Sequence, residues 1–174
     1  TATLKAASMA GIGKVALMQE PIAAVMSVMR SDNSDGIFLI FDLGGGTLDI
    51  AIAESIDGSV SLLSHGGIAM CGGRDFDRLL VKEIIKPWLE ENFVLPKDFF
   101  NMKDYATLIK LCSWAAEKAK IELSSKHNSL ITLSENEIRL NDLDGEPLYL
   151  DIPIDRNIFN SIIEVYLEQA IDSI

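Results

Sequence analysis

Three consecutive glycines stand between two apolar runs, with acids and a threonine beside them. Residues 42–49 read Asp-Leu-Gly-Gly-Gly-Thr-Leu-Asp. A simple hairpin needs only Asn-Gly or Asp-Gly, and each glycine loses more backbone entropy on folding than any other residue. Without Cβ atoms, however, the N–H groups of such a turn can approach a ligand closely and surround an anion. Gly44, Gly45 and Gly46 are therefore predicted to bind phosphate.

The polar residues beside the glycines suit phosphate chemistry. Asp42 ends the first apolar run and is predicted to hold Mg²⁺ through the waters of the ion, because Mg²⁺ dehydrates reluctantly. Thr47 can donate its hydroxyl to a phosphate oxygen or to an attacking water. Asp42 and Thr47 are the first candidate catalytic residues.

Other glycine pairs do not match known phosphate loops. Residues 11–15, Gly-Ile-Gly-Lys-Val, lack the spacing of a P-loop and its Ser or Thr after the lysine. The pairs at 66–67 and 72–73 do not form a dinucleotide fingerprint. The glycine motif at 42–49 is thus the informative one.

Three strands are predicted around this motif, at 37–42, 47–55 and 59–64. The first is continuously apolar, as in a strand buried on both faces. The links between the three strands are short, so they should form antiparallel hairpins. Before them, the pattern predicts a helix over 2–11 closed by glycines, a strand over 14–19, a helix from Pro21 to near Arg30, and a turn over 31–36.

Helices dominate the second half of the sequence. One should begin with Asp75 as its N-cap and bend near Pro87, and after a loop over 93–102 a second should cover 103–124. Two or three short strands are expected within 128–152, and a last helix from about Asp155. The order predicts an α/β protein with a mixed sheet.

Composition limits the function classes. The chain has 174 residues and a net charge of −11, which argues against nucleic acid and anionic membranes as partners. Cys71, Cys112, His65 and His127 are too scattered for a zinc site, and the cysteines should be reduced, as in a cytosolic protein.

The glycine motif resembles the second phosphate-binding hairpin of the 70-kilodalton heat-shock chaperones, within the wider actin and sugar-kinase superfamily. Three further segments are similar to chaperone motifs at matching separations. They are Glu-Pro-Ile-Ala-Ala at 20–24, Gly-Gly-Arg-Asp-Phe-Asp at 72–77 and Ala-Ala-Glu-Lys-Ala-Lys-Ile-Glu-Leu-Ser-Ser at 115–125.

This resemblance implies an actin-like (ribonuclease H-like) ATPase lobe with a mixed sheet flanked by helices, plus a small α+β subdomain. Residues 1–72 and 155–174 would form the core lobe, and 73–154 the inserted subdomain, in a fragment of a longer chain.

One helix stripe carries the implied adenosine site. Glu117, Lys120, Ile121 and Ser124 fall at helical spacing on one side, which by itself indicates only a solvated Glu/Lys pairing. By resemblance, Lys120 would bind the ribose and Ile121 would pack on the base. Glu117 and Ser124 would contact polar edges of the adenosine.

The resemblance also assigns nucleotide binding to Gly72 and Gly73, and a catalytic role to Glu20, which would orient the metal waters or the attacking water. It implies ATP or ADP with Mg²⁺ as cofactors and ATP hydrolysis in the complete protein. The fragment alone should bind ATP weakly and hydrolyse it poorly or not at all. The implied partners are nucleotide, a peptide-binding domain of the same protein, and J-domain and nucleotide-exchange co-chaperones. The implied setting is cytoplasmic protein folding and the heat-shock stress response, with no nucleic acid and no membrane as partner.

Three residues depart from the family pattern. Arg74 stands where Glu is usual, Ile22 replaces a Thr, and Ala51 replaces a small hydroxyl residue. Arg74 changes the local charge by two units near the phosphate end, where it could strengthen anion binding or displace a metal water. A non-catalytic lobe that binds nucleotide or partner proteins therefore stays open. A sugar or acetate kinase lobe is a further alternative, although it should lack the motifs at 20–24 and 115–125.

Overall fold

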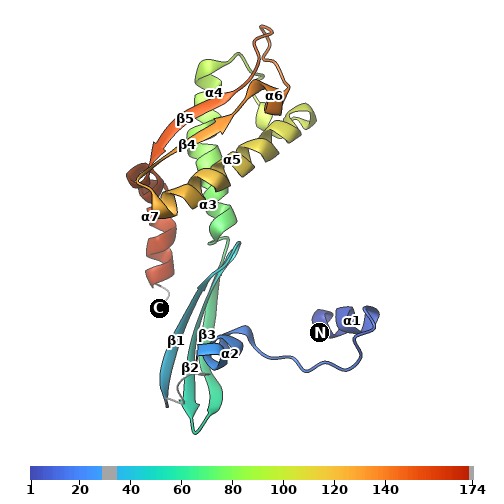
Figure 1. Cartoon of the computed structure of the whole chain (residues 1–174), viewed down its shortest axis with the longest axis vertical. Helices are drawn as coiled ribbons and strands as arrows, with labels where there is room; N and C mark the ends of the chain where they lie inside the picture. Colours follow the sequence, from blue (N-terminus) through green and yellow to red (C-terminus); the bar gives the residue numbers. More distant parts are fainter. Residues whose placement is uncertain (29–34, 173–174) are drawn as a thin grey trace. The chain divides into compact units, whose positions relative to one another are not determined.

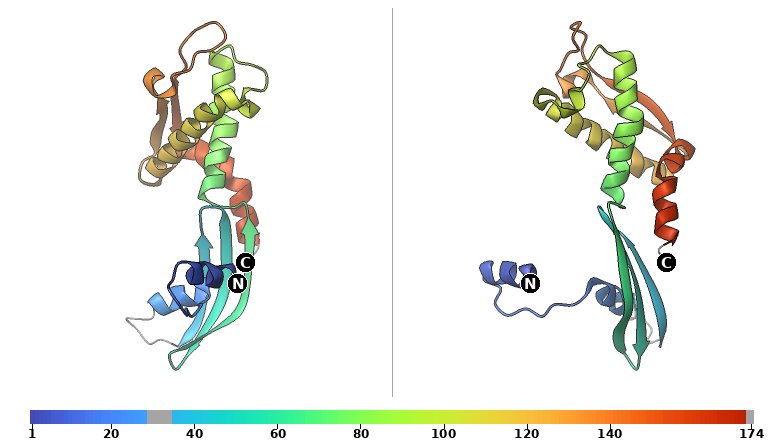
Figure 2. Two further views of the ribbon diagram at one scale, coloured as in Figure 1. Left: turned by 90° about the vertical axis from the view of Figure 1, so that its right-hand side faces the viewer. Right: turned by 180° about the vertical axis from the view of Figure 1, so that it is seen from behind.

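The computed structural model describes residues 1–28 and 35–172, which fold into two compact units (Figures 1 and 2). The first unit contains residues 1–42 and 49–67. The second contains residues 43–48 and the chain from Ile68 onward. The glycine turn therefore folds with the second unit, although the strands on either side of it run into the first.

The first unit is a three-stranded sheet with two helices, α1 (Ala2–Met9) and α2 (Glu20–Val28). The strands lie in the order β1 (Gly36–Leu43), β2 (Thr47–Ile56), β3 (Ser59–Ala69). Neighbouring strands are joined by links of two or three residues, and links this short allow only antiparallel pairing. The predicted hairpins are confirmed.

The sheet is covered on one face by α2. Val25 of α2 and Ala53 of β2 form a small core, against which Phe38 and Ile40 pack. Successive side chains of a strand point to opposite faces, so the alternate residues of β1 lie on the other face. There Ile37 is 71% exposed and Phe41 is 45% exposed. Within the described residues, β1 is therefore not buried on both faces, and that prediction is wrong.

The expected strand at 14–19 is also wrong, because these residues have no regular secondary structure. A strand exists only through hydrogen bonds to a neighbour, and no described strand pairs with this run. The described strand pairs are all antiparallel, whereas a mixed sheet was predicted.

Helix α1 ends as expected, with Gly11 and Gly13 following it at φ angles of 72° and 81°. The predicted helix end near Arg30 and most of the turn after it lie outside the described residues.

The second unit begins with a helical rod of three parts. These are α3 (Gly73–Leu80), the π-helical turn η1 (Val81–Ile85) and α4 (Lys86–Asn92). Pro87 lacks an N–H group and cannot complete an ordinary α-helical ladder, and the π-helical turn ends two residues before it. The predicted bend near Pro87 stays a prediction, and the π-helical turn before it was not predicted. The helix starts at Gly73 with Gly72 as N-cap rather than at Asp75.

A long helix, α5 (Ala106–Ser125), packs on this rod and on a two-stranded sheet (Figure 1). Strand β4 (Asn128–Leu133) pairs antiparallel with β5 (Leu150–Asp155), and α6 (Glu135–Ile138) lies between them in the chain. Two short 3₁₀ turns, η2 (Phe99–Asn101) and η3 (Lys103–Tyr105), precede α5. The helix and strands predicted for this region are confirmed. Their buried core includes Leu80, Ile85, Leu89, Phe99, Cys112, Ala116, Ile131 and Leu148.

The last helix, α7 (Arg156–Asp172), belongs to the second unit and lies beside α3 (Figure 2). Asp155 accepts hydrogen bonds from the N–H groups of Asn157 and Ile158, at 2.7 and 2.9 Å. The Arg156 side chain donates to the carbonyls of Leu123 and Lys126, so the start of α7 caps the end of α5. Within the second unit α7 packs with 73–154. The predicted grouping of 155–174 with 1–72 stays a prediction.

The overall content is α/β, as predicted from the sequence. No helix among the described residues is long and apolar enough to cross a membrane. Cys71 and Cys112 are buried free thiols, as expected.

Candidate functional site

The carbonyls of the glycine turn cap the start of α3. The carbonyl of Gly44 accepts a hydrogen bond from the N–H of Gly73 at 2.9 Å, and that of Gly45 accepts from Arg74 at 2.8 Å. The first N–H groups of a helix have no acceptor within the helix. The turn supplies those acceptors, which explains why α3 begins at Gly73 and needs no side-chain cap from Asp75.

This capping fixes the direction of the N–H groups of the turn. In a planar trans peptide the C=O and N–H bonds point in opposite directions, and the described chain contains no cis peptide. Because the carbonyls of Gly44 and Gly45 point toward α3, the N–H groups of Gly45 and Gly46 point away from it. An anion-binding turn requires N–H groups that are turned outward in this way.

Gly72 allows the close contact between the turn and α3. A Cβ atom at Gly72 would lie 2.4 Å from the nitrogen of Gly46 and 2.7 Å from the carbonyl oxygen of Gly44. No side chain fits at these distances, so the glycine is required sterically. Gly72 was predicted to bind nucleotide, and its observed contacts are with the turn itself.

Lys120 of α5 reaches the start of α3. Its Nζ donates to the carbonyl of Gly73 at 2.7 Å and lies 2.7 Å from Oδ1 of Asp77. The Asp77 side chain is only 8% exposed, and burial raises the pKa of its carboxyl even though Lys120 beside it acts in the opposite direction. Lys120 is thus held in a defined position at the edge of the turn.

A pocket of about 490 Å³ opens beside this lysine, between α3, α5 and α7. Four predicted binding residues line it: Gly44, Gly73, Lys120 and Ser124. The other lining residues are Leu43, Phe76, Leu123, Arg156, Phe159, Asn160, Ile163 and Leu167. We refer to it as the helix pocket.

The α7 residues of the helix pocket were missed from the sequence. Phe159, Asn160, Ile163 and Leu167 recur at helical spacing, which marks one face of α7. That periodicity was visible in the sequence, but it did not indicate that the face borders a pocket.

The structure divides the predicted adenosine stripe. Glu117 and Ile121 line a separate hollow of about 370 Å³, together with Trp114, Lys118 and Glu122. Lys120 and Ser124 face the helix pocket instead. The two hollows lie on neighbouring sides of α5, so the stripe borders both.

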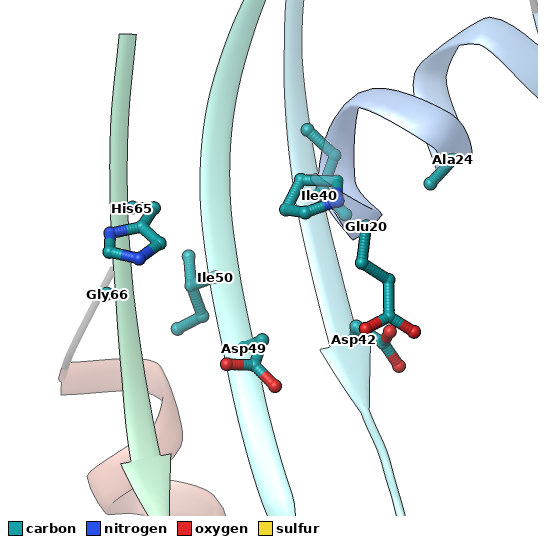
Figure 3. Close-up of a pocket in the computed structure, with 9 residues that line it drawn as sticks. Glu20, Ala24, Ile40, Asp42, Asp49, Ile50, His65 and Gly66 are labelled. Atoms are coloured by element: carbon teal, nitrogen blue, oxygen red, sulfur yellow. The ribbon is translucent and has the colours of Figure 1, made fainter. Parts of the chain in front are cut away.

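In the first unit, an acidic pocket of about 130 Å³ brings Glu20 and Asp42 together. Figure 3 shows their carboxylates next to each other, with Asp49 on the neighbouring strand. His65 on β3 lines the same pocket. Apolar residues complete the wall: Pro21, Ala24, Ile40 and Ile50, with Gly66.

The donor set of the acidic pocket suits Mg²⁺, which prefers carboxylate and water oxygens. No three His, Cys, Asp or Glu side chains in the described ranges are grouped closely enough to hold a metal directly. The predicted contact through the waters of the ion requires no such group. Asp49 was missed as a site residue, although it closes the glycine motif and lies on the same face of β2 as Thr47. Nothing in the sequence pattern pointed to His65.

Comparisons with known proteins agree with this combination of motifs. The family model described as Hsp70 protein matches residues 1–174. The chaperone protein DnaK of Thermotoga neapolitana is 33% identical over 170 residues, which are 97% of this chain and 27% of the relative. The chaperone protein DnaK of Thalassiosira pseudonana is 39% identical over 132 residues, which are 76% of this chain and 21% of the relative.

A third relative, the chaperone protein DnaK of Deinococcus proteolyticus, is 39% identical over 132 residues and is covered over 20% of its length. The chain thus spans between 20% and 27% of the length of these curated relatives. The match of the family model covers the whole sequence, well beyond the glycine motif. The chain therefore belongs to the Hsp70 family.

Proposed function

We propose that this chain is an ATP-binding lobe with an actin-like fold and contributes to the ATPase activity of an Hsp70 chaperone. The glycine turn is the observation that supports this most strongly. Its carbonyls are used by Gly73 and Arg74, so the N–H groups of Gly45 and Gly46 are left to face a ligand.

In this proposal the phosphates lie on Gly44, Gly45 and Gly46, and Thr47 donates its hydroxyl to a phosphate oxygen or to the attacking water. The adenosine lies in the helix pocket, where Lys120 and Ser124 supply polar contacts and Gly73 allows close approach. Ile121 and Glu117 border the neighbouring hollow and would contact the outer edge of the base.

Catalysis would rest on position and charge. Asp42 would hold Mg²⁺ through its waters, and the ion would neutralise charge on the phosphates when bound. Glu20, whose carboxylate lies beside Asp42, would orient a water. Phosphoryl transfer needs little covalent chemistry from the protein, so carboxylates, amides and a hydroxyl suffice.

At the level of the whole protein, we propose that nucleotide-driven closure of the lobes controls a peptide-binding domain. The relatives carry the name chaperone, which supports this proposal. J-domain and nucleotide-exchange co-chaperones in the cytoplasm are the proposed partners. Membership of the Hsp70 family argues against the sugar-kinase and acetate-kinase alternatives.

A non-catalytic lobe is the remaining alternative, since Arg74 departs from the family pattern beside the turn. Single-turnover hydrolysis of ATP by the protein at its natural length distinguishes the two. We expect Asp42→Asn to slow hydrolysis by about a hundredfold or more, the size of effect seen when a group that stabilises transition-state charge is lost. Equal rates for wild type and Asp42→Asn, with ATP bound by both, would support the non-catalytic lobe.

A further inference from the structure

Arg74 is a cation held directly against the glycine turn. Its backbone N–H donates to the carbonyl of Gly45 at 2.8 Å, and its Nε lies 3.4 Å from the same oxygen. A Cβ atom at Gly45 would lie 3.4 Å from Nε, and one at Gly46 would lie 3.4 Å from a terminal nitrogen of the guanidinium. The guanidinium therefore lies along the two glycines at the centre of the turn.

The acids of the same helix turn have cations of their own. Asp75 is paired with Arg78 at 2.8 Å, and Asp77 with Lys120 at 2.7 Å. Arg74 adds a third cation to these two pairs, at one end of a helix in a chain whose net charge is −11. The start of α3 together with Lys120 thus carries three cations and two acids, with Glu117 close enough to act on Asp77.

We propose that Arg74 is a phosphate-binding residue of this chain, held beside the glycine turn. Nε faces the carbonyl of Gly45, which leaves the terminal N–H groups of the exposed guanidinium for a ligand. Guanidinium presents these donors in a planar fork that matches phosphate oxygens. The inference rests on the proposed function, because it assigns a further contact to the same phosphate site.

The predicted ligand class is narrow. Arg74 should recognise the polyphosphate part of a nucleotide, and inorganic tripolyphosphate should be bound through the same contact. Adenosine carries no phosphate, so its binding in the helix pocket should not depend on Arg74. Of the two effects that Arg74 could have, this proposal selects stronger anion binding over displacement of a metal water.

The test is calorimetric titration of the protein at its natural length with ATP, tripolyphosphate and adenosine. We expect Arg74→Gln to weaken the binding of ATP and of tripolyphosphate by about ten- to a hundredfold, the range for a hydrogen bond to a charged group. The affinity for adenosine should be unchanged. The matched control is Lys82→Gln, which removes one positive charge from a side chain that is 74% exposed and paired with Glu83. It should leave all three affinities unchanged.

The possible outcomes separate the two proposals. If the wild type binds ATP and Arg74→Gln binds it equally well, Arg74 has no phosphate contact and the proposed function stands. If Arg74→Gln weakens adenosine binding as much as it weakens ATP binding, Arg74 only supports the fold of the turn, and the inference is overturned. If the wild type binds neither ATP nor tripolyphosphate, the proposed function fails and the inference fails with it.

A second measurement needs no variant and applies even if Arg74→Gln does not fold. The Nε–H resonance of Arg74 in the ¹⁵N-labelled wild type should shift when tripolyphosphate is added and stay in place when adenosine is added. A resonance that tripolyphosphate leaves unmoved, at concentrations where calorimetry records binding, overturns the assignment.

Discussion

The Nζ atom of Lys120 lies 2.7 Å from Oδ1 of Asp77, and the two side chains are 19% and 8% exposed. Burial raises the pKa of Asp77, so its ionised form costs stability that the cation of Lys120 offsets only in part. The pair therefore fixes the position of Lys120 more than it stabilises the fold.

The two halves of this pair should respond differently to mutation. Lys120→Met leaves a buried carboxylate without its cation and should lower the free energy of unfolding by about 1–3 kcal/mol at neutral pH. In Asp77→Asn the new amide is neutral, like the protonated carboxyl, so the free energy of unfolding should change by less than about 1 kcal/mol. Urea unfolding followed by tryptophan fluorescence measures this in the second unit, which contains both Trp88 and Trp114.

The pH dependence of the Lys120→Met deficit follows from the direction of the Asp77 shift. At low pH the carboxyl is protonated and needs no cation, so the deficit should be small. As the pH rises through the raised pKa of Asp77, the carboxylate forms and the deficit should grow. A deficit that is independent of pH, or an Asp77→Asn variant less stable than Lys120→Met, would contradict this interpretation.

Gly72→Ala should disrupt the contact between the turn and α3. The new Cβ would lie 2.4 Å from a backbone nitrogen, which a flexible side chain could avoid but a backbone cannot. We expect a loss of about 1–3 kcal/mol in the unfolding of the second unit, as for other overpacked sites. Gly145 is unsuitable as a control because its φ angle is 90°, whereas Gly66→Ala meets no atom within 4 Å. Gly66 lies in the first unit, so Gly66→Ala should leave the tryptophan-detected transition of the second unit unchanged. A Gly72→Ala variant with the same transition as wild type would show that the contact is not tight.

The cysteines should be unreactive in the folded protein. Burial raises the pKa of Cys112 to about 12, and burial together with the charge of Asp75 raises the pKa of Cys71. Thiolate is the form that reacts with alkylating agents, so at pH 8 almost no Cys112 is reactive. Iodoacetamide followed by mass spectrometry should label both residues slowly in buffer and at the rate of ordinary thiols in concentrated urea. Rapid labelling of Cys112 in buffer would indicate that the core around α5 opens.

Local sequence patterns correctly predicted the helices and strands that depend mainly on neighbouring residues. The hairpins around the glycine turn follow from apolar runs separated by short links, and α5 follows from its buried stripe through Leu108, Cys112 and Ala116. The run at 14–19 has an equally apolar pattern, but a strand also needs a partner. The described residues provide none, so the pattern alone misled.

Contacts distant in sequence account for most of the remaining differences. A local rule selects Asp75 as the cap of α3, because an acid near a helix start usually accepts its N–H groups. The acceptors are instead carbonyls of Gly44 and Gly45, almost thirty positions earlier. Asn160 likewise carries no local sign of a pocket, since only the packing of α7 on α3 brings it near Lys120.

The amide resonances of Gly45 and Gly46 give the most direct test of phosphate binding at the glycine turn. In ¹⁵N-glycine-labelled protein at its natural length, these two amides should shift when Mg²⁺-ATP is added and stay in place with adenosine. Gly145, in the loop between α6 and β5, serves as the internal control and should not move with either ligand. If ATP binds, as judged by calorimetry, while the amides of Gly45 and Gly46 do not move, the phosphates lie elsewhere and the proposed site is wrong.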